Sequence, residues 1–317
     1  MGELYFEAKR VIDEVKKVIV GKDEAIKLIM CTIVAKGHVL IEDTPGVGKT
    51  TMAKAFSKAM GLEENRVQFT PDVMPSDLTG FSVYKKDTNE FVYKKGVLMC
   101  NLFLADEINR TSPKTQSALL EAMEERKVTV DGVTRELSRP FVVIATENPE
   151  GSVGTQLLPE SQLDRFMVCV NMGYPTIEEE VEILKRRQEG DPIEKVEQLF
   201  DGKGDVITKM QEEVSNVFMN AKVLKYIAEL ASETRNNSSL ASGLSPRGSV
   251  ALAALSRAWA WIEGKNYVTP DDVKAVFYSV ASHRVTLSTK AKVAQINKSD
   301  VIDAILDDIE APTIKGI

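Results

Sequence analysis

One stretch, residues 39–51, constrains this chain more than any other. It begins with apolar residues, breaks into a turn containing glycine and proline, and continues into Gly48-Lys49-Thr50. Such a turn directs backbone N–H groups at phosphate oxygens, while the lysine reaches the β- and γ-phosphates and the Thr50 hydroxyl can ligate Mg²⁺. The helix-forming residues that follow would add the positive end of a helix dipole. The stretch therefore predicts a phosphate clamp.

The clamp departs from the strict pattern G-x-x-x-x-G-K-S/T at one position, where Asp43 replaces the first glycine. The physical loss is small, because the chain can still turn at Thr44-Pro45-Gly46. The alternative is a glycine-rich turn with an incidental lysine. The residues expected to contact the nucleotide phosphates are Pro45, Gly46, Val47, Gly48, Lys49, Thr50 and Thr51.

Two adjacent carboxylates, Asp106 and Glu107, follow a second apolar run at residues 98–105. This order is typical of a buried strand that delivers acid to its carboxyl end. Asp106 would hold Mg²⁺ through its water shell, and Glu107 would act as general base on the attacking water. The alternative is a solvated acid pair after an ordinary strand, but the position of the pair after the clamp favours catalysis.

A third apolar run, residues 141–146, ends in the polar sequence Thr146-Glu147-Asn148-Pro149. Asn148 could orient water near the γ-phosphate. A lone asparagine at the end of a strand is usually a turn residue. Its order after the clamp and the acid pair favours a sensor of phosphate.

Apolar strands alternate with helical stretches from Gly37 to Gly173, which indicates a parallel sheet covered by helices on both faces. Ligands of such sheets bind at the carboxyl ends of the strands. After Tyr174-Pro175 the pattern becomes helical. We therefore predict an α/β nucleotide-binding domain at residues 1–190 and a small all-α domain at 191–317. The expected strands span about 38–42, 66–70, 100–105, 141–146 and 167–171.

Two insertions in the α/β part are predicted to be β-hairpins. Residues 81–95 place two aromatic-rich strands around a polar turn, and residues 127–135 alternate around Asp131-Gly132, a strong hairpin turn. Paired hairpins on a nucleotide domain suggest loops that move with phosphate state. The alternative is surface decoration.

Composition narrows the function classes. The net charge of −7 argues against a dedicated DNA-binding protein, and two histidines are too few for a zinc site or a Ser-His-Asp enzyme. Three widely spaced cysteines in apolar surroundings indicate free thiols in a reducing compartment. No targeting segment or membrane-spanning stretch of about 20 apolar residues is present. We expect a cytoplasmic protein with no membrane insertion and no nucleic-acid partner.

The order of these motifs resembles the MoxR branch of the AAA+ ATPases, which are P-loop NTPases with a helical lid domain. The resemblance covers nearly the whole chain. Its motifs are residues 19–22, 43–50, 106–110, 145–149, 158–166 and 244–247.

The resemblance implies further roles. Val20 and Gly21 would line the adenine, Arg165 would be the arginine finger, and Arg247 would be the second sensor. The first hairpin would be the insertion within helix 2, and the second would precede the sensor strand. Family members look like ring-forming ATPases, usually hexamers, that act with von Willebrand factor A domain proteins to assemble or activate other proteins.

Physical reasoning supports the arginine roles, because a second guanidinium can stabilise the charge that develops on a transferring phosphoryl group. Arg165 would act on a neighbouring subunit; the alternative is a structural ion pair with Asp164 or Glu160. Arg247 begins a helix of the second domain, so it would contact phosphate in its own subunit when that domain closes. The alternative for Arg247 is a solvated arginine in a first helical turn.

The sequence thus predicts an Mg²⁺-dependent ATPase that forms a homo-oligomeric ring, a hexamer, and remodels or activates a partner protein. Two alternatives from related architectures stay open. One is the ATPase subunit of a metal chelatase. The other is a nucleic-acid-translocating motor, in which the hairpin lysines would follow phosphates, although no separate DNA-binding domain is present. A non-catalytic scaffold is disfavoured by the presence of Glu107 and Arg165. The hairpin lysines are Lys85, Lys86, Lys94 and Lys95.

Overall fold

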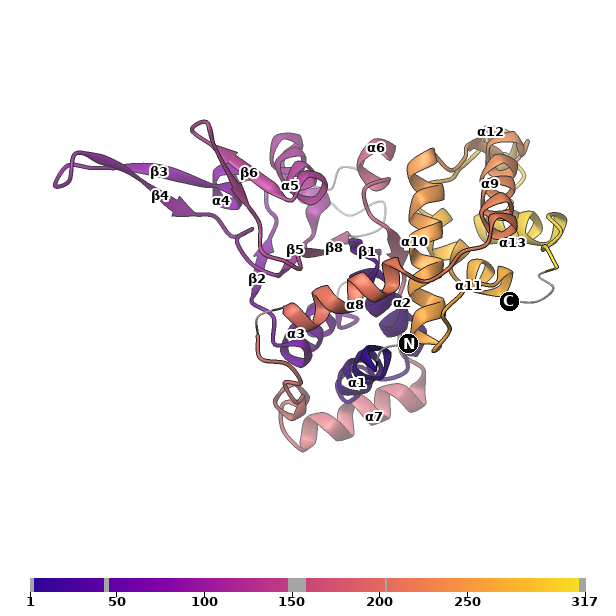
Figure 1. Ribbon diagram of the computed structural model, residues 1–317, viewed down its shortest axis with the longest axis horizontal. Helices are drawn as coiled ribbons and strands as arrows, with labels where there is room; N and C mark the ends of the chain where they lie inside the picture. The colour runs from indigo at the N-terminus through magenta and orange to yellow at the C-terminus, as the bar shows by residue number, and fades with distance from the viewer. Residues whose placement is uncertain (1–2, 43–45, 148–157, 203, 314–317) are drawn as a thin grey trace.

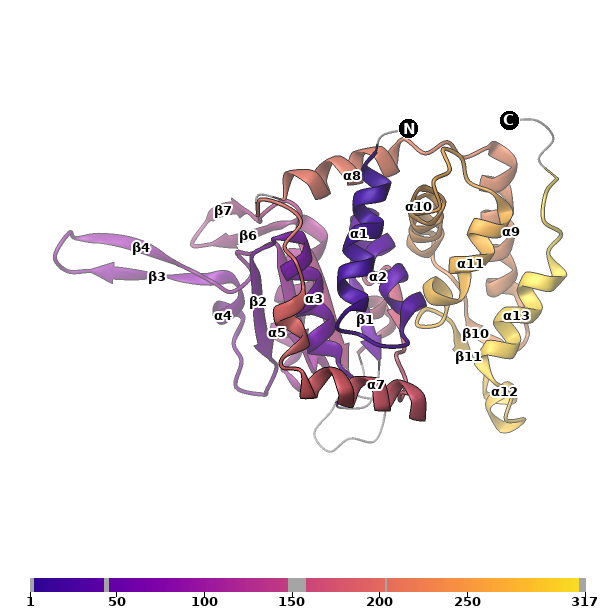
Figure 2. The same cartoon turned by 90° about the horizontal axis from the view of Figure 1, so that it is seen from below.

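The computed structural model describes residues 3–42, 46–147, 158–202 and 204–313. An α/β body occupies its centre, a group of helices lies on one side, and a long β-hairpin projects from the opposite side (Figure 1). The view from below shows the same arrangement, with the hairpin and the C-terminal helices at opposite ends (Figure 2).

The body is built on a five-stranded parallel sheet, as the alternating pattern predicts. The strand order is β2-β5-β8-β1-β9, so the clamp strand β1 lies between β8 and β9. The strand β2 begins two residues earlier than expected, because its first residues, Glu64 and Asn65, are polar at an edge of the sheet. The strands are β1 (Val39–Glu42), β2 (Glu64–Gln68), β5 (Leu102–Asp106), β8 (Val142–Glu147) and β9 (Val168–Val170).

Both faces of the sheet are covered by helices. Side chains alternate along each strand, so that Val39 and Ile41 join the apolar cluster on one face and Leu40 joins the cluster on the other. This alternation explains why the strands read as continuous apolar runs. The helices of the body are α1 (Leu4–Lys16), α2 (Asp23–Val34), α3 (Lys49–Met60), α4 (Pro75–Thr79), α5 (Pro113–Glu125), α6 (Glu160–Leu163) and α7 (Ile177–Gln188), with the 3₁₀ turns η1 (Ile108–Arg110) and η2 (Pro192–Lys195).

The C-terminal part is a helical lid, to which a short antiparallel pair of strands is added. Side chains of Ser245 and Thr269 cap the helices α10 and α11, each of which has proline at its first position, as the sequence indicates. Its elements are α8 (Asp205–Ser215), α9 (Ala221–Asn236), β10 (Leu240–Ser242), α10 (Pro246–Ile262), α11 (Pro270–Ala281), β11 (Thr286–Leu287), α12 (Thr289–Val293) and α13 (Lys298–Asp308).

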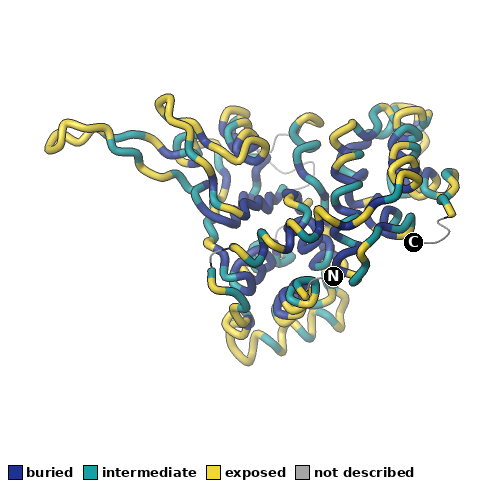
Figure 3. The backbone as a smooth tube through the Cα atoms, viewed as in Figure 1, coloured by how far each residue is buried: buried dark blue, intermediate teal, exposed yellow. Residues whose placement is uncertain are grey.

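One apolar cluster runs without a break from the first three helices and the sheet into the lid helices α8 to α11. Body and lid therefore share a core, and the division between residues 190 and 191 stays a prediction. Dark blue segments in Figure 3 follow this core, whereas the tip of the projecting hairpin is exposed. Among the described residues, none of the helices has the length and apolarity needed to cross a membrane.

Both predicted hairpins form. The first pairs β3 (Gly80–Lys85) with β4 (Glu90–Lys95), and the second pairs β6 (Lys127–Val130) with β7 (Val133–Glu136). At the turn of the second hairpin, Asp131 and Gly132 have φ of 52° and 75°. Positive φ at both central residues matches the twist of the strands, which is why Asp-Gly is such a strong hairpin signal.

Candidate active site

The phosphate clamp joins the carboxyl end of β1 to the first residue of α3. Gly46 and Gly48 have φ of 91° and 95°, a region that favours glycine, and Gly48 is the N-cap of α3. The start of such a helix, with its N–H groups and the positive end of its dipole, suits an anion. Pro45, together with Asp43 and Thr44, lies outside the described residues.

The predicted acid pair meets the clamp in one cavity of about 290 Å³. Clamp residues form one part of its wall, and the ends of β2, β5 and β8 form the other. The cavity is lined by Gly46, Gly48, Lys49, Thr50, Thr51, Arg66, Gln68, Asp106, Glu107 and Thr146. Seven of these residues were predicted from the sequence to lie at a nucleotide site, and the fold brings all seven together.

Asp106 is buried and accepts hydrogen bonds at both carboxylate oxygens. Its Oδ2 accepts from Thr50 Oγ1 at 3.3 Å and from Arg66 Nε at 2.7 Å. Its Oδ1 accepts from Thr146 Oγ1 at 3.1 Å. Three donors from three separate elements therefore fix the orientation of this carboxylate beside the clamp.

Glu107 adopts the left-handed conformation, with φ of 56°. Such a conformation is costly for a residue with a side chain, and it is maintained here by contacts on both sides. Its N–H donates to Thr146 Oγ1 at 2.9 Å, and its Oε2 accepts from Arg110 at 2.7 Å. Thr146 therefore orders both acids, because the same hydroxyl donates to Asp106.

The donor set fits a magnesium ion bound together with a nucleotide. Thr50 and Asp106 present hydroxyl and carboxylate oxygens, which Mg²⁺ prefers, and they lie within 3.3 Å of each other. Within the described part of the chain, no cluster of three or more acidic, histidine or cysteine side chains could hold a metal. The remaining ligands would have to come from phosphate and water, as is usual for Mg²⁺.

A second cavity of about 240 Å³ lies on the other side of the clamp and shares Gly46, Gly48 and Thr51 with the first. Val20, which was predicted to line the adenine, lies in its wall, and so does Val47 of the clamp. Further lining comes from Ile19, Pro175, Ile183 and Arg186. Its walls are more apolar than those of the first cavity, so the pair suits a nucleotide with its base in one cavity and its phosphates in the other.

Gly21 does not line this cavity, but it shapes the segment that does. Its φ is 72°, and a Cβ at this position would lie 1.8 Å from the Glu179 carboxylate. A side chain here would displace Glu179 of α7, whose carboxylate is 3.8 Å from Lys22. The positive φ favours glycine at this position, next to the segment that carries Val20.

The end of β8 lies beside the clamp lysine, since Lys49 donates to the Glu147 carbonyl oxygen at 3.3 Å. Burial, with Glu42 nearby, raises the pKa of the Glu147 carboxyl to about 7, although Lys49 opposes the change. Strand register places Glu42 directly opposite Glu147. Asn148, the predicted sensor, lies outside the described residues.

The two predicted arginines lie together, but away from the clamp. Arg165 Nε donates to Glu124 Oε2 at 3.0 Å, and Arg247 contacts the other oxygen of the same carboxylate. The alternative partners considered for Arg165 are engaged elsewhere: Asp164 pairs with Arg284 at 2.7 Å, and Glu160 accepts from Thr286.

Glu124 marks the amino end of the sheet, opposite to the clamp. The carbonyl of the residue before it, Met123, contacts His38, which immediately precedes β1. Met167, two residues after Arg165, donates to the His38 carbonyl oxygen at 2.8 Å. The length of β1, about 13 Å at 3.3 Å per residue, therefore separates both arginines from the clamp of their own subunit.

Four contributing residues were not assigned a role from the sequence: Arg66, Arg110, Thr146 and Glu124. Thr146 and Arg110 fall inside motifs that were recognised, so their position next to the strand ends was a usable signal. Arg66 acts across the sheet from β2 to β5, and Glu124 joins two segments distant in sequence. No local pattern marks contacts of that kind.

Comparison with known proteins agrees with this fold and site. Residues 38–168 match the ATPase family associated with various cellular activities (AAA), and residues 232–305 match the AAA lid domain. A solved structure from Cytophaga hutchinsonii, named as a candidate ATPase, superposes with a TM-score of 0.89 at 35% identity and covers 98% of this chain and 96% of its own. The fold and site thus define an AAA+ ATPase.

Two curated relatives narrow the class. The chain is 38% identical to the chaperone MoxR1 of Mycobacterium tuberculosis, over 98% of this chain and 83% of the relative. It is 45% identical to the uncharacterised protein YeaC of Bacillus subtilis, over 96% and 94%. The chain belongs to the MoxR family of AAA+ ATPases.

Proposed function

We propose that this chain hydrolyses ATP with Mg²⁺ in a homo-oligomeric ring, a hexamer, and uses the reaction to remodel or activate a partner protein. The observation that carries the proposal is one cavity lined by Lys49, Thr50, Asp106 and Glu107, beside a second cavity that shares part of the clamp with it. A phosphate binder, two metal-ligand oxygens and a candidate base therefore surround one space.

Each residue has a separate task in this account. Lys49 and the N–H groups of the clamp bind the phosphates in the ground state. Thr50 and Asp106 hold Mg²⁺, which when bound offsets the negative charge of the phosphate oxygens. Glu107 accepts the proton of the attacking water, and Thr146 fixes the geometry between the two acids. Asn148 would orient that water.

The position of Arg165 supports a ring. It lies at the amino end of the sheet, opposite to the clamp, so a second copy of the chain is needed for Arg165 to meet a nucleotide. Arg247 was expected to reach the phosphate of its own subunit, but its place beside Arg165 favours the neighbouring subunit for both arginines. A ring would bring the clamp of one subunit to the arginines of the next at every interface.

The role in remodelling proteins rests on the family. One relative is named a chaperone, and we extend that class of activity to this chain. A protein client, acting with a von Willebrand factor A domain protein in the cytoplasm, agrees with the net charge of −7, which disfavours nucleic acid as the substrate.

The experiment is a measurement of ATP turnover per subunit over a range of protein concentrations, with the assembly state followed by analytical ultracentrifugation. We expect activity per subunit to rise with the fraction in rings, because each site needs the neighbouring arginines. Equal activity in a proven monomer would overturn the ring. The variant Glu107→Gln, which is expected to bind ATP without hydrolysing it, serves as bait to identify the client.

A further inference from the structure

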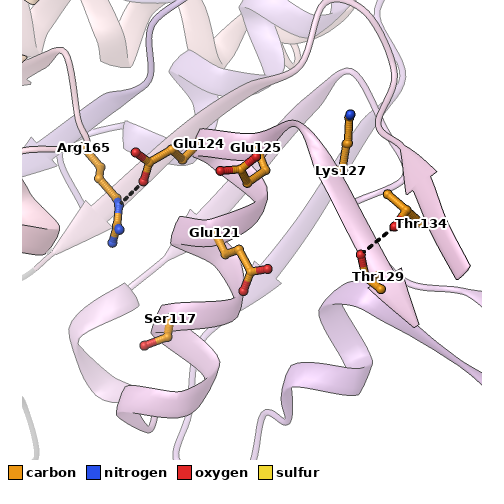
Figure 4. A pocket seen from close by; sticks show the side chains of 8 residues that line it. All are labelled: Ser117, Glu121, Glu124, Glu125, Lys127, Thr129, Thr134 and Arg165. Atoms are coloured by element: carbon orange, nitrogen blue, oxygen red, sulfur yellow. Dashed lines mark hydrogen bonds and ion pairs between the residues drawn. The ribbon is translucent and has the colours of Figure 1, made fainter. Parts of the chain in front are cut away.

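The carboxylate of Glu124 joins two arginines that come from different parts of the chain. Arg165 precedes β9 of the body, and Arg247 lies in the first turn of α10 in the lid. Each arginine contacts its own oxygen of Glu124, with Arg165 at 3.0 Å. Figure 4 shows the side chains of Arg165 and Glu124 directed at each other above α5.

These ion pairs contribute little to the stability of the fold. The side chain of Glu124 is 40% exposed, and the side chains of Arg165 and Arg247 are 31% and 44% exposed. Exposed pairs contribute little because water and salt screen them. Their effect on position is larger, because two guanidinium groups repel each other unless an anion lies between them.

The backbone on both sides of Arg165 is held by the lid. Arg284, with a side chain only 2% exposed, pairs with the Asp164 carboxylate at 2.7 Å and donates to the carbonyl oxygens of Phe166 and Met167. Ser245, the N-cap of the helix that carries Arg247, also donates to Asp164, at 2.8 Å. The two arginines therefore start from backbone segments in a fixed relation, and Glu124 fixes their ends.

We infer that Glu124 is a positioning residue that holds Arg165 and Arg247 as one pair for the neighbouring subunit's nucleotide. The inference rests on the proposed function, in which both arginines act across a subunit interface. Carboxylate and phosphate groups accept N–H donors from guanidinium groups in similar ways. Arg165 and Arg247, held by Glu124, are therefore already arranged to bind a phosphoryl group. The body and the lid present them together.

The test is steady-state ATP turnover of assembled Glu124→Ala and Glu124→Gln. We expect kcat of Glu124→Ala to fall about 10- to 100-fold, which corresponds to the loss of a charge-assisted hydrogen bond. The affinity for nucleotide should change less than about threefold, because Glu124 is remote from its own clamp. Glu124→Gln should lie between the wild type and Glu124→Ala, because its amide oxygen accepts from one arginine while its amide nitrogen only donates.

Glu121→Ala and Glu125→Ala are matched controls, since both glutamates line the same groove on α5. Neither forms an ion pair with a residue in the described ranges. We expect wild-type kcat from both. The double variant Glu124→Ala/Arg165→Ala should lose less turnover than the product of the two single losses, because residues that act as a unit are not additive.

Three results would overturn the inference: unchanged or raised kcat in Glu124→Ala, full additivity with Arg165→Ala, or a loss of kcat that follows a loss of assembly or folding. Failure of the proposed function is distinct from these. In that case Arg165→Ala itself keeps wild-type turnover in the assembled protein, whereas failure of the inference alone leaves Arg165→Ala slow.

Discussion

At the scale of single residues, the two acids at the end of β5, Asp106 and Glu107, differ in their hydrogen-bond partners. Asp106 is buried and bonded to Thr50 of the clamp, so it belongs to the metal site. Glu107 has a left-handed backbone, its carboxylate accepts a hydrogen bond from Arg110, and it lines the same cavity. These different surroundings agree with the proposed division of roles, in which Asp106 binds the metal ion and Glu107 accepts the proton.

The variant Glu107→Gln should bind ATP and fail to hydrolyse it, because an amide keeps the shape of the side chain and cannot accept the proton. We expect a loss of at least about 100-fold in kcat, typical of a removed general base.

Lys49→Ala should weaken binding by about tenfold or more, through loss of a charge-assisted contact.

Binding of a fluorescent ATP analogue, beside turnover, separates these two effects. Lys54→Ala is the control, because Lys54 is an exposed lysine of the same helix. Near-normal turnover in Glu107→Gln would refute its assignment as base. Unchanged affinity in Lys49→Ala would refute the clamp.

Glu147 provides a prediction of pH dependence. Burial and Glu42 raise the pKa of its carboxyl from 4.5 to about 7. A raised pKa contributes stability that is complete below the ordinary pKa and is lost as the pH rises through about 7. Glu147→Gln cannot ionise, so it should match the wild type near pH 5 and exceed its free energy of unfolding by roughly 1 to 3 kcal/mol near pH 8.5.

Urea denaturation of the nucleotide-free protein at both pH values measures this difference. Glu212→Gln, a change at an exposed glutamate of α8, controls for general effects of charge. A difference from the wild type that is the same at both pH values would contradict the raised pKa.

At the scale of elements, the hairpin β3–β4 is set apart from the rest of the body. Its tip exposes Tyr84 and Phe91, and no residue of the two strands belongs to either apolar cluster. Only its base is tied down, where Arg135 of the second hairpin lies 3.8 Å from the centre of the Tyr93 ring. The hairpin therefore suits contact with another molecule more than support of the fold.

Replacing residues 84–91 with a two-residue turn should leave the melting temperature within about 3 °C of the wild type, because surface changes away from packed contacts have small effects. Basal ATP turnover should also persist. A larger loss of stability would show that the tip supports the body.

Salt-dependent binding to single- and double-stranded DNA tests the motor alternative, for which affinity should fall steeply with salt.

Local patterns predicted the elements well, because strands, caps and hairpin turns depend on residues close in sequence. Thr269 and Asp131-Gly132 are examples in which a few side chains decide the local structure. The cross-chain contacts of Arg66 and Glu124 depend on how strands and domains are arranged, so they could not be derived in this way. The short pair β10–β11 in the lid was missed for the same reason, since its strands lie far apart in sequence.

At the scale of the whole molecule, the clamp and the arginine pair lie at opposite ends of the strands of one sheet. The lid contacts the amino end through the ion pair between Arg284 and Asp164, while the nucleotide cavities lie at the carboxyl end. Within one copy, the clamp and the arginine pair therefore do not meet. In the proposed ring, the clamp of one copy would face the arginine pair of its neighbour, so each hydrolysis step would depend on an interface.

The most direct measurement of this account mixes two inactive variants, Arg165→Ala and Glu107→Gln, after subunit exchange has been demonstrated. Arg165→Ala alone should lose up to about 10³-fold in turnover, as other arginine fingers do. In mixed rings, some interfaces pair an intact Glu107 with an intact Arg165 from the other variant. The account predicts that mixing restores ATP turnover, in proportion to such interfaces and increasingly with protein concentration. Exchange of subunits without any recovery of turnover would contradict it.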